Sequence, residues 1–169
     1  VVLVAVNYRL GPLGYFAHPA LTKAAGPDAP LINYGLMDQI AALEWVKRNI
    51  AGFGGDPDNV TLFGESAGAM STLQILAIPK TKGLYKRAIV QSGGGWFAPA
   101  SLAEKEAAGA EIATALGLAG ANASAAELRA VPVERLIAET TTGNYGPSPD
   151  GRLLKETPSQ AFAAGRGGG

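Results

Sequence analysis

The sequence contains no cysteine and only one histidine, His18. Without cysteine the chain can form neither disulfide bonds nor thiolate metal sites. A single histidine means that any catalytic step through an imidazole within these residues has one candidate. The lack of cysteine does not fix a cellular compartment, so the localisation stays unknown at this point. The oligomeric state is equally open.

An excess of charge of either sign is also missing. The 169 residues carry 14 basic and 14 acidic side chains, and 47% of them are hydrophobic. Without a basic excess, binding to nucleic acid has no electrostatic support. The apolar opening run, residues 1–8, is too short to span a membrane and lacks the features of a signal peptide. The composition predicts a globular protein with a buried core.

The order of apolar segments indicates a parallel α/β fold. Continuous apolar runs predict strands over residues 1–8, 60–64 and 87–93. Helices are expected between them, over residues 36–50 and 67–77, and such crossovers are typical of a parallel sheet. The first of these helices is supported by apolar residues at steps of three and four: Leu36, Ile40, Leu43, Val46 and Ile50.

Two regions of different character follow from this pattern. Residues 1–98 are expected to form the sheet core, with an irregular proline-containing loop over 17–34. Residues 99–169 are expected to form a region of helices and loops. Its predicted helices cover residues 101–116, 124–131, 133–141 and 158–164. Because the sequence opens without methionine inside an apparent strand, we expect an internal fragment of a longer polypeptide.

The candidate for chemistry is the stretch LFGESAGAMS, residues 62–71, in which Gly64, Ser66 and Gly68 form a G-x-S-x-G motif. The motif lies between a predicted strand and a predicted helix, where it forms a sharp turn that exposes a nucleophilic serine. The backbone N–H of Ala67 would then point at the negative charge that develops on the substrate oxygen. The plain alternative is that Ser66 only caps the following helix.

Several longer stretches resemble one known family. VNYRLGPLG, NYGLMDQIAALEWVKRNIAGFGGDPDNVTLFGESAG and AIVQSG are similar to the type-B carboxylesterases, which include cholinesterases and p-nitrobenzyl esterases. The resemblance implies a partial α/β-hydrolase fold, with a parallel central sheet, a nucleophile elbow and a helical, loop-rich insertion after the third strand. It also implies hydrolysis of a small carboxylic ester through an acyl-enzyme on Ser66, with Ala67 as an oxyanion donor. No metal or organic cofactor is implied.

The resemblance indicates three further residues as candidates for the site. Glu65 matches an acidic position near the active centre of the family, although it could be an ordinary carboxylate at a helix start. Ser92 matches a buried serine beside the catalytic residues, or it is simply a turn serine after a strand. Trp96 falls where the family places residues of the acyl pocket, although a large apolar side chain after a strand is often core.

The partners that Ser66 would need are not evident. The family places the acid and then the histidine after the serine, and no histidine follows Ser66. His18 precedes the motif and is expected to be a solvent-facing loop residue. The acidic residues after the motif lack the family context and are expected to be solvated: Glu127, Glu134, Glu139, Asp150 and Glu156. The glycine-rich oxyanion loop of the family is also absent.

Three functions remain open from the sequence. The leading one is a serine ester hydrolase represented by part of its chain. A non-catalytic, cholinesterase-like binding or adhesion domain is the second, although such relatives typically lose the elbow serine, which this chain keeps. A small self-contained α/β binding domain with an incidental serine is the third. Ester preference is not readable from these residues.

Overall fold

The computed structural model describes residues 1–94, 98–140, 143 and 145–167. The chain divides into two compact units. The sheet unit consists of Val1–Tyr8, Leu36–Ala98 and Leu154–Gly169, and the helical unit consists of Arg9–Gly35 and Pro99–Leu153. The sequence pattern had placed all of residues 1–98 with the sheet and all of 99–169 outside it. Here the segment from Arg9 to Gly35 belongs instead to the helical unit.

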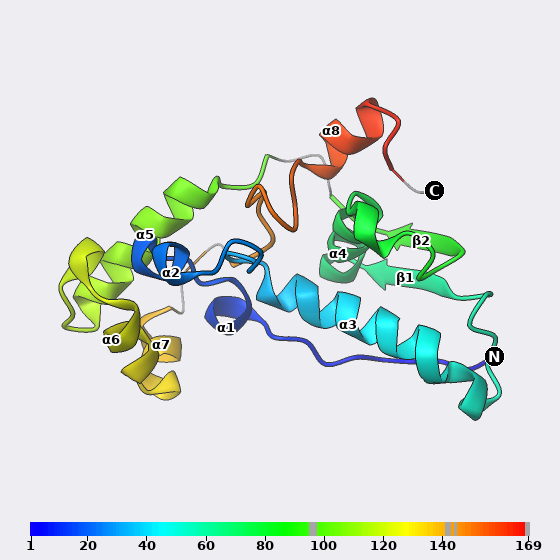
Figure 1. The fold of residues 1–169 in the computed structure, drawn as a ribbon, viewed down its shortest axis with the longest axis horizontal. Coiled ribbons are helices and arrows are strands. Elements are labelled where there is room, and N and C mark those ends of the chain that lie inside the picture. The colour runs from blue at the N-terminus through cyan, green and yellow to red at the C-terminus, as the bar shows by residue number, and fades with distance from the viewer. Residues whose placement is uncertain (95–97, 141–142, 144, 168–169) are drawn as a thin grey trace. The chain divides into compact units, whose positions relative to one another are not determined.

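Two parallel strands and a helix form the centre of the sheet unit (Figure 1). Strand β1 (Thr61–Glu65) pairs with β2 (Arg87–Gln91), so that the last residues of the two strands, Glu65 and Gln91, lie opposite each other. Helix α4 (Ala67–Leu76) starts two residues after β1 and packs against both strands. The carboxyl ends of both strands therefore meet at the edge of the sheet where α4 begins.

The long helix α3 (Tyr34–Asn49) confirms the amphipathic pattern in the sequence. Its predicted apolar stripe is buried throughout, with exposed fractions between 0% and 8% from Leu36 to Ile50. The helix continues into a short 3-10 turn, Ile50–Phe53, and Gly54 ends that turn in the left-handed region at φ 79°. Glycine adopts this conformation without the steric cost that a Cβ brings.

The predicted strand over residues 1–8 is not formed. This segment is extended, but it belongs to neither strand of the sheet, and the side chains of Val1 and Leu3 are exposed. A strand requires a neighbour that accepts and donates its backbone hydrogen bonds. Among the described residues of the sheet unit, none takes that position. The apolar composition therefore matches a strand, whereas the ladder itself is lacking.

The helical unit contains five helices among its described residues. They are α1 (Gly11–Tyr15), α2 (Pro19–Ala24), α5 (Leu102–Ala115), α6 (Ala125–Ala130) and α7 (Val133–Glu139), with a 3-10 turn at Gly120–Asn122. The first two helices replace the irregular chain expected over residues 17–34 and the turn before it. Each has a proline at its start, where the fixed φ of proline suits a first helical turn.

The core of the helical unit is small and includes Tyr15, Ala17 and Ile32, with Leu102 and Tyr145 packed against them. Capping boxes start both α5 and α6: Ser101 with Glu104, and Ser124 with Glu127. The second of these stands at the start of the helix predicted over residues 124–131. In each box the serine hydroxyl accepts from the backbone N–H of the glutamate, and the glutamate carboxylate accepts from the backbone N–H of the serine. Two N–H groups at the helix start thereby gain acceptors that the helix itself does not supply.

Buried polar contacts join distant loops of the helical unit. Asn33 donates from Nδ2 to the Ser148 carbonyl at 2.8 Å and accepts from the Ser148 N–H at 3.0 Å. Asp150, expected to be solvated, is only 7% exposed, because its carboxylate accepts from the N–H groups of Leu31 and Arg152. That prediction was wrong, since spacing along the chain gives no sign that residues 31 and 150 meet.

The remaining elements complete the sheet unit. A 3-10 turn, Pro79–Thr81, follows α4, and α8 (Pro158–Ala163) contacts α4. Thr157 caps α8 with Gln160 in a third capping box. Across the ranges that the structure describes, no helix combines the length and the apolar composition needed to cross a membrane.

Candidate active site

Ser66 occupies a strained turn between β1 and α4. Its backbone has φ 51° and ψ −113°, and among the described residues only one other non-glycine, Ser92, has a positive φ. Holding a residue with a Cβ in such a conformation costs on the order of 1–3 kcal/mol. Strain of this kind persists where the surrounding structure imposes it, and it commonly accompanies function. The turn has the strand–turn–helix form expected of a nucleophile elbow.

Backbone hydrogen bonds on both sides hold this turn. The Ser66 N–H donates to the Gln91 carbonyl at 2.9 Å, and the Ser66 carbonyl accepts from the Met70 N–H at 3.0 Å. Ser66 thus occupies the N-cap position of α4, but its side chain makes no capping hydrogen bond. The residue is exposed. The alternative that Ser66 serves only as a helix cap is therefore wrong, and its hydroxyl is left available for chemistry.

The two glycines of the motif have different structural roles. A Cβ on Gly64 would lie 2.3 Å from both the carbonyl carbon and the oxygen of Gly68, so only glycine fits there. A Cβ on Gly68 would meet nothing within 4 Å among the described residues. In the structure only Gly64 is required by contact, because the first turn of α4 folds back onto its backbone.

The start of α4 places donors next to Ser66. Ala67 is the first residue of this ten-residue helix and is exposed. The first four N–H groups of a helix have no intrahelical acceptor, and the helix dipole adds partial positive charge there. Thr72, which is 1% exposed, secures the same turn by donating from Oγ1 to the Gly68 carbonyl at 2.9 Å. Ala67 therefore presents its N–H at the turn that carries Ser66.

Ser92 lies beside the elbow through the pairing of the strands. It directly follows β2 at φ 54°, just as Ser66 directly follows β1, and the residues before them, Glu65 and Gln91, are paired. Ser92 is exposed, whereas the resemblance suggested a buried serine. The sequence-predicted residues Glu65, Ser66, Ala67 and Ser92 are thus gathered at one edge of the sheet.

A contact that no sequence motif indicated fixes the chain after Ser92. A Cβ on Gly93 would lie 2.7 Å from the Cβ of Ala69 and 2.9 Å from Cγ1 of Val90. Ala69 belongs to α4 and is fully buried. The turn after β2 therefore sits directly on the first turn of α4. The available signal was a glycine immediately after a strand-end serine, which suggests a close backbone approach.

The structure says less about the roles of Glu65 and Trp96, the two other residues that the sequence indicated. Glu65 is the last residue of β1 and is exposed, so it is not the helix-start carboxylate of the alternative interpretation. Trp96, assigned to the acyl pocket by resemblance, lies outside the described residues.

His18 is a structural residue of the helical unit. It is fully buried, which overturns the expectation of a solvent-facing loop residue. It caps α2, where Nδ1 accepts from the Ala20 N–H at 3.1 Å, and Nε2 lies 3.0 Å from the Gly120 carbonyl. This pairing requires the proton on Nε2, so both ring nitrogens are occupied. His18 has no free nitrogen with which to accept a proton from a serine.

The acidic residues that follow the motif have local partners or lie at the surface. Hydrogen bonds from the backbone and hydroxyl of Ser124 lower the pKa of Glu127, which starts α6. The guanidinium of Arg166 hydrogen-bonds Glu156 and lowers the pKa of that carboxyl. Glu134 and Glu139 are exposed on α7. Among the described residues, none of these carboxylates has an interaction that marks it as a catalytic acid.

Comparison with known proteins places the chain in a family. The model of the carboxylesterase family matches residues 1–167. Among curated proteins, the fumonisin B1 esterase of Sphingopyxis macrogoltabida is 42% identical, over 98% of this chain and 31% of its own length. The para-nitrobenzyl esterase of Bacillus subtilis is 41% identical, over 100% of this chain and 35% of its own. The chain spans about one third of the length of these relatives.

Solved structures agree with the sequence relatives. The crystal structure of the Geobacillus stearothermophilus carboxylesterase EST55 at pH 6.8 superposes with a TM-score of 0.82 at 39% identity, covering 95% of this chain and 35% of that one. A PNB esterase superposes with a TM-score of 0.81 at 36% identity over the same shares of the two chains. These likenesses confirm the predicted partial α/β-hydrolase fold. With its strained serine on the turn from β1 to α4, the chain belongs to the carboxylesterase family.

Proposed function

We propose that these residues are the nucleophile-bearing part of a serine carboxylic-ester hydrolase. The observation that carries this proposal is Ser66, an exposed serine at φ 51° whose hydroxyl does not cap the helix that follows it. Conformational strain at an exposed serine has a clear use in nucleophilic catalysis, because it lifts the hydroxyl clear of the backbone. Membership of the carboxylesterase family supports the same reaction.

The proposed chemistry proceeds in two stages. Oγ of Ser66 attacks the carbonyl carbon of the ester, and the alcohol leaves with a proton to give an acyl-enzyme. Water then attacks the acyl-enzyme, releases the carboxylic acid and restores the serine. The Ala67 N–H, at the start of α4, stabilises the negative charge on the carbonyl oxygen in both stages.

The base and the acid of this mechanism come from outside residues 1–169. No histidine follows Ser66, and His18 uses both ring nitrogens inside the helical unit. A glycine-rich loop from elsewhere in the polypeptide would supply further oxyanion donors. Glu65 and Ser92 lie at the same sheet edge as Ser66, where we assign them to support of the catalytic residues. Trp96 is assigned to the acyl side of the substrate pocket.

The test of the nucleophile uses the full reading frame that contains these residues. The Ser66→Ala variant is expected to lose hydrolysis of short-chain p-nitrophenyl esters by a factor of at least about 10³, as removal of a nucleophile does. The Ser159→Ala variant, which alters a serine of α8, is the matched control and should keep its activity. Full activity in Ser66→Ala would refute the assignment.

A second measurement separates the enzyme from a non-catalytic binding domain. A fluorophosphonate probe reacts with an activated serine and leaves a covalent adduct that mass spectrometry locates. We expect the adduct on Ser66 in the full-length protein and no ester turnover by residues 1–169 alone. If the full-length protein neither hydrolyses esters nor takes up the probe, a binding or adhesion role replaces the esterase.

A further inference from the structure

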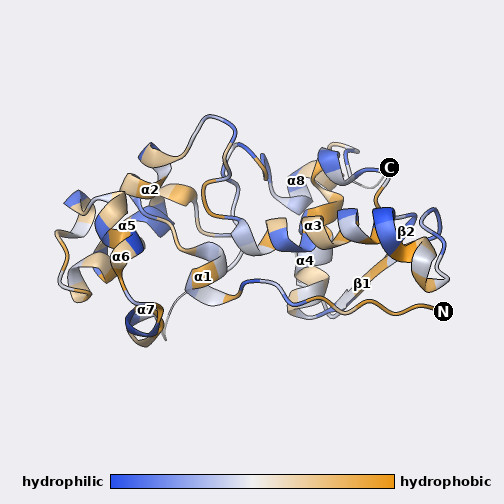
Figure 2. Ribbon diagram, turned by 60° about the horizontal axis from the view of Figure 1, so that its bottom comes forward, coloured by the Kyte–Doolittle hydropathy of each residue, from blue (hydrophilic) through white to orange (hydrophobic). Residues whose placement is uncertain are grey.

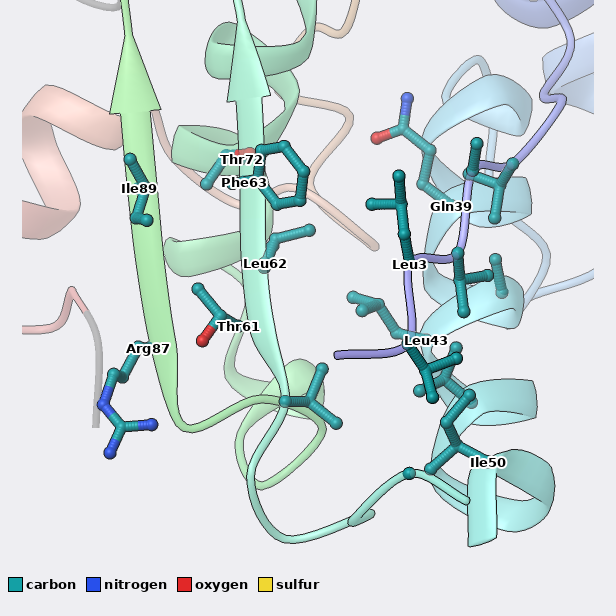
Figure 3. A pocket seen from close by; sticks show the side chains of 18 of the residues that line it. Leu3, Gln39, Leu43, Ile50, Thr61, Leu62, Phe63, Thr72, Arg87 and Ile89 are labelled. Atoms are coloured by element: carbon teal, nitrogen blue, oxygen red, sulfur yellow. The ribbon is translucent and has the colours of Figure 1, made fainter. Parts of the chain in front are cut away.

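Two cavities of the described chain differ in the groups that line them. The cavity of the sheet unit, about 970 Å³ between residues 1–6 and β1, is mainly apolar, and its charged residues, Asp56 and Arg87, are exposed (Figure 3). The cavity of the helical unit is smaller, about 310 Å³, but its lining includes Lys105, which is only 8% exposed. A buried cation costs free energy unless it has a partner, so the smaller cavity is the better candidate for a charged ligand.

One face of α5 forms the long side of the smaller cavity. The lining residues on this helix recur at steps of three and four: Lys105, Ala108, Ile112 and Ala115. Such steps place side chains on one face of a helix, and the ten residues from Lys105 to Ala115 rise by about 15 Å. In Figure 2, α5 combines hydrophilic and apolar residues. We refer to this space as the α5 groove; Lys105 lies at one end of it and apolar residues follow along its length.

The opposite wall of the α5 groove is held in direct contact with the helix. This wall is formed by residues 15–17, and a Cβ on Gly109 of α5 would clash with the carbonyl of Ala17. Tyr15 and Ala17 belong to the buried core of the helical unit, and Tyr145, which also lines the groove, packs against that core. The groove is therefore a preformed space between elements whose separation is fixed, as is usual for small-molecule sites.

Lys105 has no counter-ion among the described residues. Its ammonium group has three N–H donors, and the acceptor that the structure gives it is the Gly146 carbonyl. Burial lowers the pKa of Lys105 to about 8, and no carboxylate acts against that shift. At pH 7 the amine is therefore mainly protonated and buried in the lining of a cavity. A carboxylate bound in the groove would supply the missing charge and accept further hydrogen bonds.

The other lining residues favour a ligand with a single negative charge. Glu111 and Glu139 line the groove and are exposed, so they lie at its mouth. A second carboxylate on the ligand would approach these two side chains and be repelled. The side chains of Phe16 and Ile112 are half-buried in the lining and would pack against a hydrocarbon tail. The volume of the groove lies at the lower end of the range for small-molecule sites.

We propose that the α5 groove binds a monocarboxylate with an unbranched apolar tail, whose carboxylate pairs with the Lys105 ammonium and whose tail lies along Ala108, Ile112 and Ala115. Medium-chain fatty acids belong to this class of ligand. The site goes beyond the proposed ester hydrolysis, because it depends on residues of the helical unit and not on Ser66.

The first experiment measures binding of octanoate to the full reading frame by titration calorimetry at pH 7. Wild type should bind octanoate saturably, and Lys105→Met should bind it at least about tenfold more weakly, since the variant lacks a charge-assisted hydrogen bond. Lys23→Met is the matched control, because Lys23 is an exposed lysine of α2 outside the groove, and it should bind as wild type does. The uncharged analogue 1-octanol should bind wild type at least about tenfold more weakly than octanoate.

Two neighbouring alanines of α5 test where the tail lies. Ala107 and Ala108 are both exposed, but only Ala108 lines the groove. Ala108→Leu narrows the groove and should weaken octanoate binding at least about fivefold, whereas Ala107→Leu should leave it unchanged. This pair keeps the proposal testable if Lys105→Met fails to fold, because leucine is well tolerated on an exposed helix face.

The dependence of binding on pH identifies the charged group. Affinity of wild type for octanoate should fall as pH rises above about 8, because Lys105 then loses its proton in the free protein. The other titratable side chains that line the groove are Glu111, Glu139, Tyr15 and Tyr145. They are unchanged in Lys105→Met, so the residual binding of that variant should not show the fall above pH 8.

Four outcomes would overturn the proposal. They are the absence of saturable octanoate binding, equal binding by wild type and Lys105→Met, binding of 1-octanol as tight as that of octanoate, and equal effects of Ala107→Leu and Ala108→Leu. None of these measurements involves ester turnover. Failure of the proposed hydrolysis, which full activity in Ser66→Ala would show, is therefore distinguishable from failure of this site.

Discussion

At the scale of single residues, the two glycines of the elbow make opposite predictions. Gly64→Ala should destabilise the protein by at least about 1–3 kcal/mol, because the added Cβ would lie 2.3 Å from backbone atoms of Gly68 that cannot move freely. Gly68→Ala is the matched control and should be neutral or stabilising by up to about 1 kcal/mol, since alanine favours a helix and the space is open. Free energies of unfolding in denaturant measure both. Equal effects of the two substitutions would contradict this account.

His18 gives a second prediction at the residue scale. His18→Ala removes the cap from the Ala20 N–H and leaves the half-buried Gly120 carbonyl without its donor, so the protein should lose about 1–3 kcal/mol of stability. His18→Asn can still cap α2 and should recover about 1 kcal/mol of that loss. The rate at which Ser66 is labelled by a fluorophosphonate should be unchanged in the folded fraction of both variants. A loss of labelling would instead indicate that His18 takes part in the reaction.

The residue scale also shows where sequence reasoning ended. The motif predicted the turn at Ser66 correctly, because the local order of strand, glycine, serine and helix is sufficient to specify that geometry. His18 and Asp150 were mispredicted, because their partners lie far away in sequence: 102 residues for His18 and Gly120, and 119 residues for Asp150 and Leu31. A polar side chain that is buried against a partner so distant in sequence leaves no periodic pattern in the sequence.

At the scale of elements, α5 predicts a pH-dependent stability. Lys105 on this helix is 8% exposed and donates to the Gly146 carbonyl, and burial lowers its pKa to about 8. Between pH 8 and the ordinary lysine value of 10.5, the native protein has released this proton while the unfolded chain still holds it. The unfolded state then binds more protons, so the free energy of unfolding should rise with pH across this interval.

A comparison with Lys105→Met isolates that effect. The substitution removes the titration and keeps an unbranched apolar side chain in place. The free energy of unfolding of the wild type should therefore rise relative to that of the variant as pH rises from about 8 to about 10.5. Chemical denaturation at several pH values in this range gives the measurement. A constant difference would show that the amine titrates alike in the folded and unfolded chains.

The elements themselves were largely readable from sequence. The strands at Thr61–Glu65 and Arg87–Gln91 and the helix α3 follow the predicted ranges closely. For α3, the apolar periodicity reflects the burial of its stripe. The extended segment Val1–Tyr8 did not become a strand, because the β-propensity of its residues does not supply a neighbour. The short helices α1 and α2 were missed, because proline marks both a turn and a helix start.

At the scale of the whole molecule, contacts between distant segments decide stability. The helical unit is assembled from Arg9–Gly35 and Pro99–Leu153, and Asn33 and Ser148 link those two segments through a pair of buried hydrogen bonds. The sequence could not predict this division, because neither segment has a composition that marks its partner. A domain boundary at residue 98 alone would have left residues 9–35 with the wrong neighbours.

Asn33→Ala should therefore destabilise the helical unit strongly. Asn33 is fully buried, and its removal leaves both the N–H and the carbonyl of Ser148 buried without a partner, at a cost of about 1–3 kcal/mol for each group. Hydrogen exchange followed by mass spectrometry should show loss of protection in the peptide that contains the Ser148 amide.

Ser148→Ala is the matched control, because the Ser148 hydroxyl is buried with no hydrogen-bond partner among the described residues. It keeps both backbone bonds and should be neutral or stabilising by about 1 kcal/mol. If the two variants were destabilised equally, the link would depend on packing at residue 148 and not on the paired hydrogen bonds of Asn33.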